Sequence, residues 1–347
     1  MLSNRSDPTK PDREKGGQRM DFQHIIGHED IIRHFKSSIE MDRVGHAYII
    51  CGEDESGRSS LAFSFAKTLQ CEVGGFDPCN ECPSCKKADS GNHPDIIMIQ
   101  HEKPNLISVE EVRTQLIDTM EIRPYSGKYK IYIINDAQLM QAPAQNALLK
   151  TIEEPPQYGI VILITNSLEK LLPTIVSRCI TLSTKPIKER DMEEYLRESY
   201  DLDEKRIRFC VEYAQGNLGK AILLATNEEY EGLIRSVIQL EKNIFDMDME
   251  DIAFAIESCT NYKMSIGEYL DLMMVWYRDI LMLKVTGKYD KLIFQEEYST
   301  IKDQAKYLSY NELEDKARAV ENAKKRIAAN ARLEDVMRLL IMTLKEK

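Results

Sequence analysis

The stretch Gly52-Glu53-Asp54-Glu55-Ser56-Gly57-Arg58-Ser59 decides the fold class that this sequence predicts. It matches the phosphate-binding loop G-x-x-x-x-G-K-[ST] at both glycines and at the final serine, but Arg58 replaces the lysine. Residues 46–51, just before the loop, are apolar and predict a short buried strand, and residues 60–69, from Ser60 on, predict a helix. A strand before the loop and a helix after it are the context that such a motif requires.

The loop departs from a working phosphate loop in its charges. Gly52 and Gly57 keep available the backbone shape that wraps a phosphate with amide groups, and Ser59 keeps a hydroxyl for Mg²⁺. Arg58 keeps the positive charge but replaces a compact ammonium by a wide planar fork. Residues 53–55 add three carboxylates, which would repel a triphosphate. The sequence therefore predicts a weak or inactive nucleotide site; the alternative is an ordinary strand-to-helix turn that keeps its glycines.

Further apolar runs predict the rest of a sheet. Helical patterns separate them, and strands that alternate with helices and are apolar throughout predict a parallel sheet covered on both faces. The four additional strands are expected at residues 95–99, 129–134, 159–164 and 179–182. Active sites of such sheets lie at the carboxyl ends of the strands. The loop, Asn135-Asp136 and Thr165-Asn166 all fall at such ends.

A second alteration lies at the end of the third strand. A hydrolysing enzyme of this class ends a strand with an Asp that holds Mg²⁺ and usually a Glu that activates water. Here the strand ends in Asn135, which is neutral and a poor metal ligand, and Asp136, which is one methylene shorter than Glu. Both positions that hydrolysis requires are altered, and together the two changes argue against hydrolysis more strongly than either one alone. The alternative is that the pair caps a helix.

Cys71, Cys79, Cys82 and Cys85 crowd together with the spacing C-x7-C-x2-C-x2-C. Four thiolates can close a tetrahedral Zn²⁺ site, and C-x2-C spacing lets one turn of chain chelate a single ion. The cluster predicts a structural zinc with no open position for catalysis; the alternative is unbonded or redox-active thiols. His93 lies nearby, but it precedes a proline and a strand, so we expect a turn there.

Composition narrows the class of protein. The chain has 347 residues, enough for two or three domains of roughly 100–200 residues each. A net charge of −11 argues against a protein that coats nucleic acid over its whole surface. The sequence shows neither a secretory signal nor an apolar run of the roughly 18–20 residues that a membrane helix needs. We therefore expect a soluble, cytoplasmic protein.

The pattern changes along the chain in three places. Residues 1–19 are polar and charged and predict a disordered leader, after which Met20 is an alternative start. Residues 20–184 carry the strand and helix alternation, with the cysteine module at 71–85. Residues 185–228 fit three short helices, and residues 229–347 predict helix after helix.

Ser177-Arg178-Cys179 lies between a short helix pattern and the fifth strand. An arginine at the end of an element can project toward a neighbouring molecule. A guanidinium that reaches a γ-phosphate in trans stabilises the charge of the transition state. The alternative is an ordinary surface arginine.

Several of these motifs occur together and in a recognisable order. They are Gly27-His28-Glu29-Asp30, Gly45-His46-Ala47-Tyr48, the four-cysteine module, Asn146-Ala147-Leu148-Leu149-Lys150-Thr151-Ile152-Glu153-Glu154-Pro155-Pro156, and Ser177-Arg178-Cys179. In this respect the chain resembles the clamp-loader branch of the AAA+ family over about residues 20–225.

The resemblance implies an AAA+ α/β domain, a three-helix lid domain and an all-α collar domain through which subunits associate. Clamp loaders are pentamers that open a ring-shaped clamp and place it on primed DNA. By the same resemblance, Arg178 matches the arginine that enters the ATP site of the adjacent motor subunit. Asn166 matches the sensor-1 position and Lys220 the sensor-2 position.

The departures from the family pattern favour a non-hydrolysing, stator-like subunit of the bacterial DNA polymerase III loader. Motor subunits keep the lysine and the Asp-Glu pair, whereas this chain has Arg58 and Asn135-Asp136. Whether ATP binds stays open. Its partners would be the ATPase motor and delta-type subunits, the sliding clamp and primed DNA. The alternatives are an active motor in which Arg58 stands in for lysine, and a zinc-dependent nucleic-acid-binding module.

Overall fold

A computed structural model describes residues 21–260, 262 and 266–346. The leader expected at residues 1–19 lies outside these residues. The chain forms two compact units, and each is described by itself. The N-terminal unit extends to Tyr195 and also includes Gln215–Lys220, while the C-terminal unit contains Leu196–Ala214 and Ala221–Lys347. The division of residues 20–347 into an AAA+ domain, a lid and a collar stays a prediction.

A five-stranded sheet forms the centre of the N-terminal unit, and all of its strand pairs are parallel, as predicted. Its order is β2-β3-β4-β1-β5. The strands are β1 (Ala47–Cys51), β2 (Ile96–Met98), β3 (Lys130–Ile134), β4 (Gly159–Thr165) and β5 (Ile180–Ser183). Cys51 pairs with Thr165, so the loop after β1 begins beside the end of β4.

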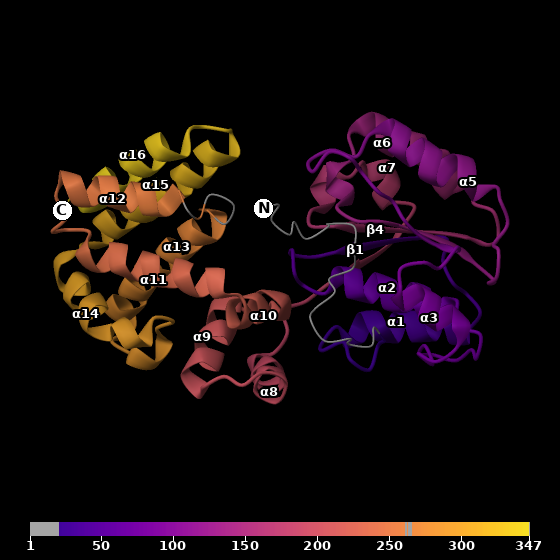
Figure 1. The fold of residues 1–347 in the computed structure, drawn as a ribbon, viewed down its shortest axis with the longest axis horizontal. Coiled ribbons are helices and arrows are strands. Elements are labelled where there is room, and N and C mark those ends of the chain that lie inside the picture. Colours follow the sequence, from indigo (N-terminus) through magenta and orange to yellow (C-terminus); the bar gives the residue numbers. More distant parts are fainter. Residues whose placement is uncertain (1–20, 261, 263–265, 347) are drawn as a thin grey trace, which may run out of the picture. The chain divides into compact units, whose positions relative to one another are not determined.

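Helices cover both faces of this sheet (Figure 1). One face carries α1 (Glu29–Glu40), α2 (Arg58–Leu69) and α3 (Pro83–Asp89). The other carries α4 (Val109–Val112), the π-helical turn η1 (Arg113–Ile117), α5 (Asp118–Met120), α6 (Ala142–Glu153) and α7 (Pro173–Val176). Phe35 and Phe65 stack in the first layer, and Leu116 and Leu148 are buried in the second. Both faces of the sheet are therefore cores, which is why its central strands are apolar throughout.

The edge strand β5 differs from the sequence-based expectation of strands buried on both faces. Every residue of β3 and β4 is buried, but Ile180 in β5 is 37% exposed and its neighbour Thr181 is also exposed. The reason is position, because β5 pairs only with β1 and forms one edge of the sheet.

Local signals fix several element ends. Ser108 and Glu111 form a capping box at the start of α4. The helix α6 ends at Glu153, just before the two prolines at 155–156 that cannot continue it. The helix α2 begins at Arg58, two residues earlier than its apolar pattern alone indicates.

Three short helices follow the sheet, as expected. They are α8 (Glu189–Ser199), α9 (Glu204–Ala214) and α10 (Leu218–Thr226). Gln215 and Gly216 both have left-handed backbone conformations between α9 and α10. The amide of Ile187 donates to the carbonyl of Gly216 at 2.8 Å, which ties this turn to the N-terminal unit.

The rest of the C-terminal unit is helical, as predicted. It contains α11 (Glu228–Asn243), α12 (Met249–Thr260), α13 (Ile266–Thr286), the short 3-10 turns η5 (Tyr289–Lys291) and η6 (Gln295–Glu297), α14 (Tyr298–Tyr307), α15 (Tyr310–Ala328) and α16 (Leu333–Lys345). The long helix α13 packs against α11, α14 and α15 and buries Trp276 completely. Among the helices of the described residues, none is long and apolar enough to cross a membrane.

Candidate functional site

The loop between β1 and α2 is held in shape from several sides. Gly52 has no room for a side chain, because a Cβ there would lie 1.8 Å from Thr184 Oγ1. Gly57 forms the N-cap of α2 with φ of 80°, a left-handed conformation that favours glycine. His28 Nε2 lies 2.9 Å from the carbonyl oxygen of Ser56. The two glycines of the motif are therefore required by geometry in this chain, so the loop is more than an unconstrained turn.

Arg58, the residue in the place of the lysine, is paired within the loop. Its side chain is 8% exposed, and Nη2 donates to Asp54 Oδ1 at 2.5 Å. The Asp54 carboxylate also accepts from Asn166 Nδ2 at 3.3 and 3.4 Å. Arg58 Nη1 is buried and has no hydrogen-bond partner among the described residues. A carboxylate of the loop itself thus faces the cation that would otherwise face a phosphate.

The polar residues that the sequence predicted at the carboxyl ends of β3 and β4 lie beside the loop after β1. Ser59 Oγ lies 3.5 Å from Asn135 Oδ1, and Ser60 follows half-buried in the first turn of α2. Asp136 precedes the short 3-10 helix η2 (Ala137–Leu139) at the N-cap position, but its side chain makes no capping hydrogen bond. Asp136 therefore lies where the helix-cap alternative places it, but its side chain does not make the hydrogen bond that a capping residue usually makes.

The first turn of α10 lies against the loop, a contact that sequence reasoning missed. Asn217 Nδ2 donates to the carbonyl oxygen of Asp54 at 2.8 Å, and the amide of Lys220 donates to Asn217 Oδ1 at 3.1 Å. A Cβ at Gly219 would lie 2.3 Å from the carbonyl oxygen of Glu55, so only glycine fits this approach. The glycine and asparagine at 216–217 indicate a turn, but no local pattern predicts its contact with the loop.

Arg178 lies apart from the loop, at the end of α7. Its Nε is 2.7 Å from Glu153 Oε1 at the end of α6, and its Nη1 donates to the carbonyl of Thr174 at 3.0 Å. The side chain is 40% exposed. Burial raises the pKa of the adjacent Cys179 thiol to about 12, which leaves that thiol protonated and unreactive near neutral pH. The structure therefore presents a guanidinium, not a nucleophile, at this position.

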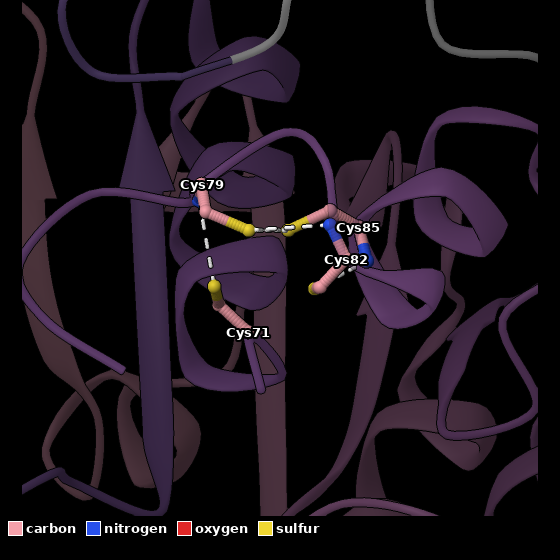
Figure 2. A group of neighbouring side chains, drawn as sticks. All are labelled: Cys71, Cys79, Cys82 and Cys85. Atoms are coloured by element: carbon pink, nitrogen blue, oxygen red, sulfur yellow. Dashed lines mark hydrogen bonds between the residues drawn. The ribbon is translucent and has the colours of Figure 1, made fainter. Parts of the chain in front are cut away.

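The four cysteines of the predicted module come together (Figure 2). All four are free thiols, and their sulfur atoms lie within 4.8 Å of one another. Cys79 Sγ and Cys85 Sγ are 4.0 Å apart. Tetrahedral Zn²⁺ with bonds of about 2.3 Å places its sulfur ligands about 3.8 Å apart. The donor set and its spacing therefore fit a metal ion of this kind.

Backbone amides favour thiolates in this cluster. The amide of Cys82 donates to Cys79 Sγ at 3.3 Å, and the amide of Cys85 donates to Cys82 Sγ at 3.4 Å. The amides of Glu81 and Cys82 lower the pKa of Cys79 to about 6. Burial and the neighbouring Cys82 instead raise the pKa of Cys85. Four thiolates repel one another in a small volume, and a divalent cation is the partner that offsets this repulsion.

A buried lysine anchors the cysteine module to α2. Lys67 is fully buried, and its Nζ donates to Asn80 Oδ1 at 2.6 Å and to Asp89 Oδ1 at 2.5 Å. Asn80 in turn donates from Nδ2 to Asp21 Oδ2 at 2.7 Å. This cation therefore links the helix after the loop to both ends of residues 80–89, the segment that carries Cys82 and Cys85.

His93 is not part of the cluster. Its Nε2 lies 3.0 Å from Ser84 Oγ, and its Nδ1 accepts from the amide of Asp95 at 3.1 Å. One ring nitrogen thus bonds within the turn before β2 and the other contacts Ser84 of α3.

Two comparisons find similarity to subunits of DNA polymerase III. A family model described as "DNA polymerase III, delta subunit" matches residues 27–188. The delta' subunit of DNA polymerase III from Bacillus subtilis is 32% identical over 314 residues, which cover 89% of this chain and 94% of that subunit.

Two further proteins are similar to this chain, one over part of its length and one at low identity. The tau/gamma subunit of DNA polymerase III from Haemophilus influenzae is 32% identical over 209 residues, which cover 58% of this chain and 30% of that longer subunit. Among solved structures, a DNA polymerase III gamma subunit-related protein from Thermotoga maritima shares 18% identity. That alignment covers 91% of this chain and 98% of that protein, with a TM-score of 0.45.

Proposed function

Because the chain belongs to the delta-prime family of DNA polymerase III subunits, we propose that it is the stator-like subunit of a clamp loader, which does not hydrolyse ATP itself. It would help to load the sliding clamp on primed DNA and would donate Arg178 to the ATP site of a neighbouring motor subunit. The role in clamp loading is proposed from the family to which the chain belongs. The donation of Arg178 is proposed from the exposure of its side chain.

The internal pairing of Arg58 is the observation that carries the non-hydrolysing role. In a working site the cation of the loop faces the β- and γ-phosphates. Here it faces Asp54 at 2.5 Å. The strand end beside it offers the amide of Asn135 where a hydrolysing site needs a carboxylate for Mg²⁺. Both changes remove charge interactions on which phosphoryl transfer depends.

The surroundings of Arg178 support a role in trans. The guanidinium contacts Glu153 and the carbonyl of Thr174, and both contacts leave it 40% exposed. A guanidinium placed on developing phosphoryl charge accelerates transfer strongly, and arginine is suited to this because its planar fork binds two oxygens at once. The guanidinium of Arg178 is suited neither to act as a catalytic base nor to act as a nucleophile. The chemistry available to it is therefore the donation of positive charge.

The remaining partners belong to the same proposal. We expect contacts with the ATPase motor and delta-type subunits through the helical C-terminal unit, and a cytoplasmic location. We also assign Zn²⁺ to Cys71, Cys79, Cys82 and Cys85. The ion would hold the module folded, and because four sulfur ligands would fill its coordination shell it would offer no position for a substrate.

The test is ATP turnover by a reconstituted loader that contains Arg178→Ala. The account predicts that turnover stimulated by clamp and primed DNA falls about tenfold or more, since arginine fingers contribute large factors to phosphoryl transfer. Arg190→Ala, which removes an exposed arginine of α8, is the matched control and should leave turnover unchanged. Unchanged turnover with Arg178→Ala in an intact complex would overturn the role in trans.

A further inference from the structure

Asp54 occupies the centre of the altered loop. Its carboxylate accepts from Arg58 Nη2 at 2.5 Å and from Asn166 Nδ2 at 3.3 and 3.4 Å. Its backbone carbonyl accepts from Asn217 Nδ2 at 2.8 Å. Donors from the start of α2, the end of β4 and the start of α10 therefore converge on one residue of the loop.

These donors are of the kind that a phosphate group requires. A phosphate at the start of a helix is bound by nitrogen donors and by positive charge, and a carboxylate offers the same combination of negative charge and acceptor oxygens. Asp54 thus presents to Arg58 and Asn166 the chemistry that a nucleotide would present.

Burial explains why such a partner is needed. The Arg58 side chain is 8% exposed, and an unpaired guanidinium so deep in the protein is costly, because it loses its hydration. The partial positive charge at the start of α2 adds to that of Arg58. The carboxylate of Asp54 offsets the charge of Arg58 in this place. Arg58 Nη1 stays without a partner among the described residues, so the arginine has a further donor for a second acceptor.

We propose that Asp54 is the resident anion of this loop: its carboxylate takes the position of a phosphate group and keeps oxyanions out. The loop is a closed anion site that supplies its own ligand, and once Asp54 is removed it takes an oxyanion of the polyphosphate class. This inference rests on the proposed function, because it explains why the chain does not use ATP, but it is independent of Arg178.

The side chain of Asp54 is 66% exposed, although its partner is buried. Truncation of Asp54 would therefore open the position to solvent without creating a cavity in the core. Glu53 offers a matched comparison, since it is an exposed carboxylate of the same loop and none of the hydrogen bonds or ion pairs that involve Arg58 includes it. A change at Glu53 removes the same charge but leaves the proposed anion in place.

The experiment is a calorimetric titration of the full chain with inorganic tripolyphosphate. Asp54→Ala should bind the probe at least about tenfold more tightly than the unchanged chain, and Asp54→Asn, which keeps the size, should show a smaller gain. Glu53→Gln should remain within about threefold of the unchanged chain. Adding Arg58→Ala to Asp54→Ala should abolish the gain.

Three results would overturn the inference. The first is tight binding of tripolyphosphate by the unchanged chain. The second is an equal gain in affinity with Glu53→Gln, which would assign the exclusion to general charge repulsion. The third is no gain in affinity in Asp54 variants whose melting temperature equals that of the unchanged chain. If Asp54→Ala fails to fold, the result for Asp54→Asn decides. ATP turnover is followed in parallel. Hydrolysis by the unchanged chain would contradict the proposed function, whereas the titration tests Asp54 alone.

Discussion

The loop after β1 and the cysteine cluster lie in the same unit but balance their charges in opposite ways. In the loop, the buried cation of Arg58 has an anion of the chain, Asp54, at 2.5 Å. In the cluster, four sulfur atoms lie within 4.8 Å of one another, and the amide groups around them donate to thiolates without supplying a full positive charge. The first region pairs its cation with a carboxylate of the chain, whereas the second would be completed by the proposed metal ion.

The two motifs therefore differ in what they predict about a bound ligand. A motif whose ligand has been replaced by a residue of the chain can keep its shape after its chemistry is gone. A motif whose residues all carry the same kind of donor would still need an ion to offset the repulsion between them. Substitutions that affect only one of the two regions therefore test whether they differ in this way.

Loss of the metal should have the largest effect. We expect one zinc per chain by elemental analysis, and Cys82→Ser should lose it together with several kcal/mol of stability, because binding of a structural zinc is itself folding free energy. Cys259→Ala, at a buried cysteine of α12 outside the cluster, should keep the zinc. Full zinc content in Cys82→Ser would contradict the assignment.

A buried carboxylate of the C-terminal unit gives the next largest effect. Burial raises the pKa of Glu241 to about 8, although Tyr277 donates to it at 2.8 Å and Lys316 lies near. The folded state therefore binds a proton that the unfolded state loses above about pH 4.5, so stability falls as the pH rises from there through about 8. The loss should reach a few kcal/mol in denaturant titrations. Glu241→Gln should flatten this dependence; an unchanged slope would contradict the assignment.

A smaller effect is expected for the lysine that anchors the cysteine module. Lys67→Met removes two hydrogen bonds to Asn80 and Asp89 and should cost about 1–3 kcal/mol in chemical denaturation. Lys128→Met, which breaks an exposed ion pair with Asp42, should cost about 0–1 kcal/mol. Equal losses of unfolding free energy in the two variants would mean that the buried hydrogen bonds of Lys67 add no more stability than an exposed ion pair.

The smallest effect concerns the orientation of Arg178. Glu153→Gln weakens a half-exposed ion pair, and such pairs contribute about 0–1 kcal/mol. Because Glu153 fixes one edge of the guanidinium, we expect turnover by the assembled loader to fall about two- to fivefold. A loss as large as that of Arg178→Ala would show instead that Glu153 acts within the ATP site.

Much of the N-terminal unit follows from local sequence. The alternation of apolar runs predicted the parallel sheet, and the spacing of the cysteines predicted their cluster. Each apolar run and the cysteine motif is a pattern within a short stretch of the chain, although the strands themselves pair across long distances in sequence. The family resemblance, read from motifs in order, is confirmed by the Bacillus subtilis relative.

The remaining features depend on residues distant in sequence. Asn217 meets Asp54 across 163 positions, and Asn166 meets it across 112. Neither contact has a local pattern. The repulsive reading of the loop carboxylates was incomplete for a different reason, because Asp54 is only four positions from Arg58 but pairs with it once the loop is folded. The exposure of Ile180 likewise depends on the strand order, which the sequence does not state.

The central claim is that this chain retains the shape of a nucleotide site without its chemistry. ATP turnover by the isolated full-length chain, in the presence of Mg²⁺, tests it most directly. The account predicts no phosphate release above the background without protein. Steady hydrolysis that disappears with Ser59→Ala would contradict it, because the loop would then be an active site.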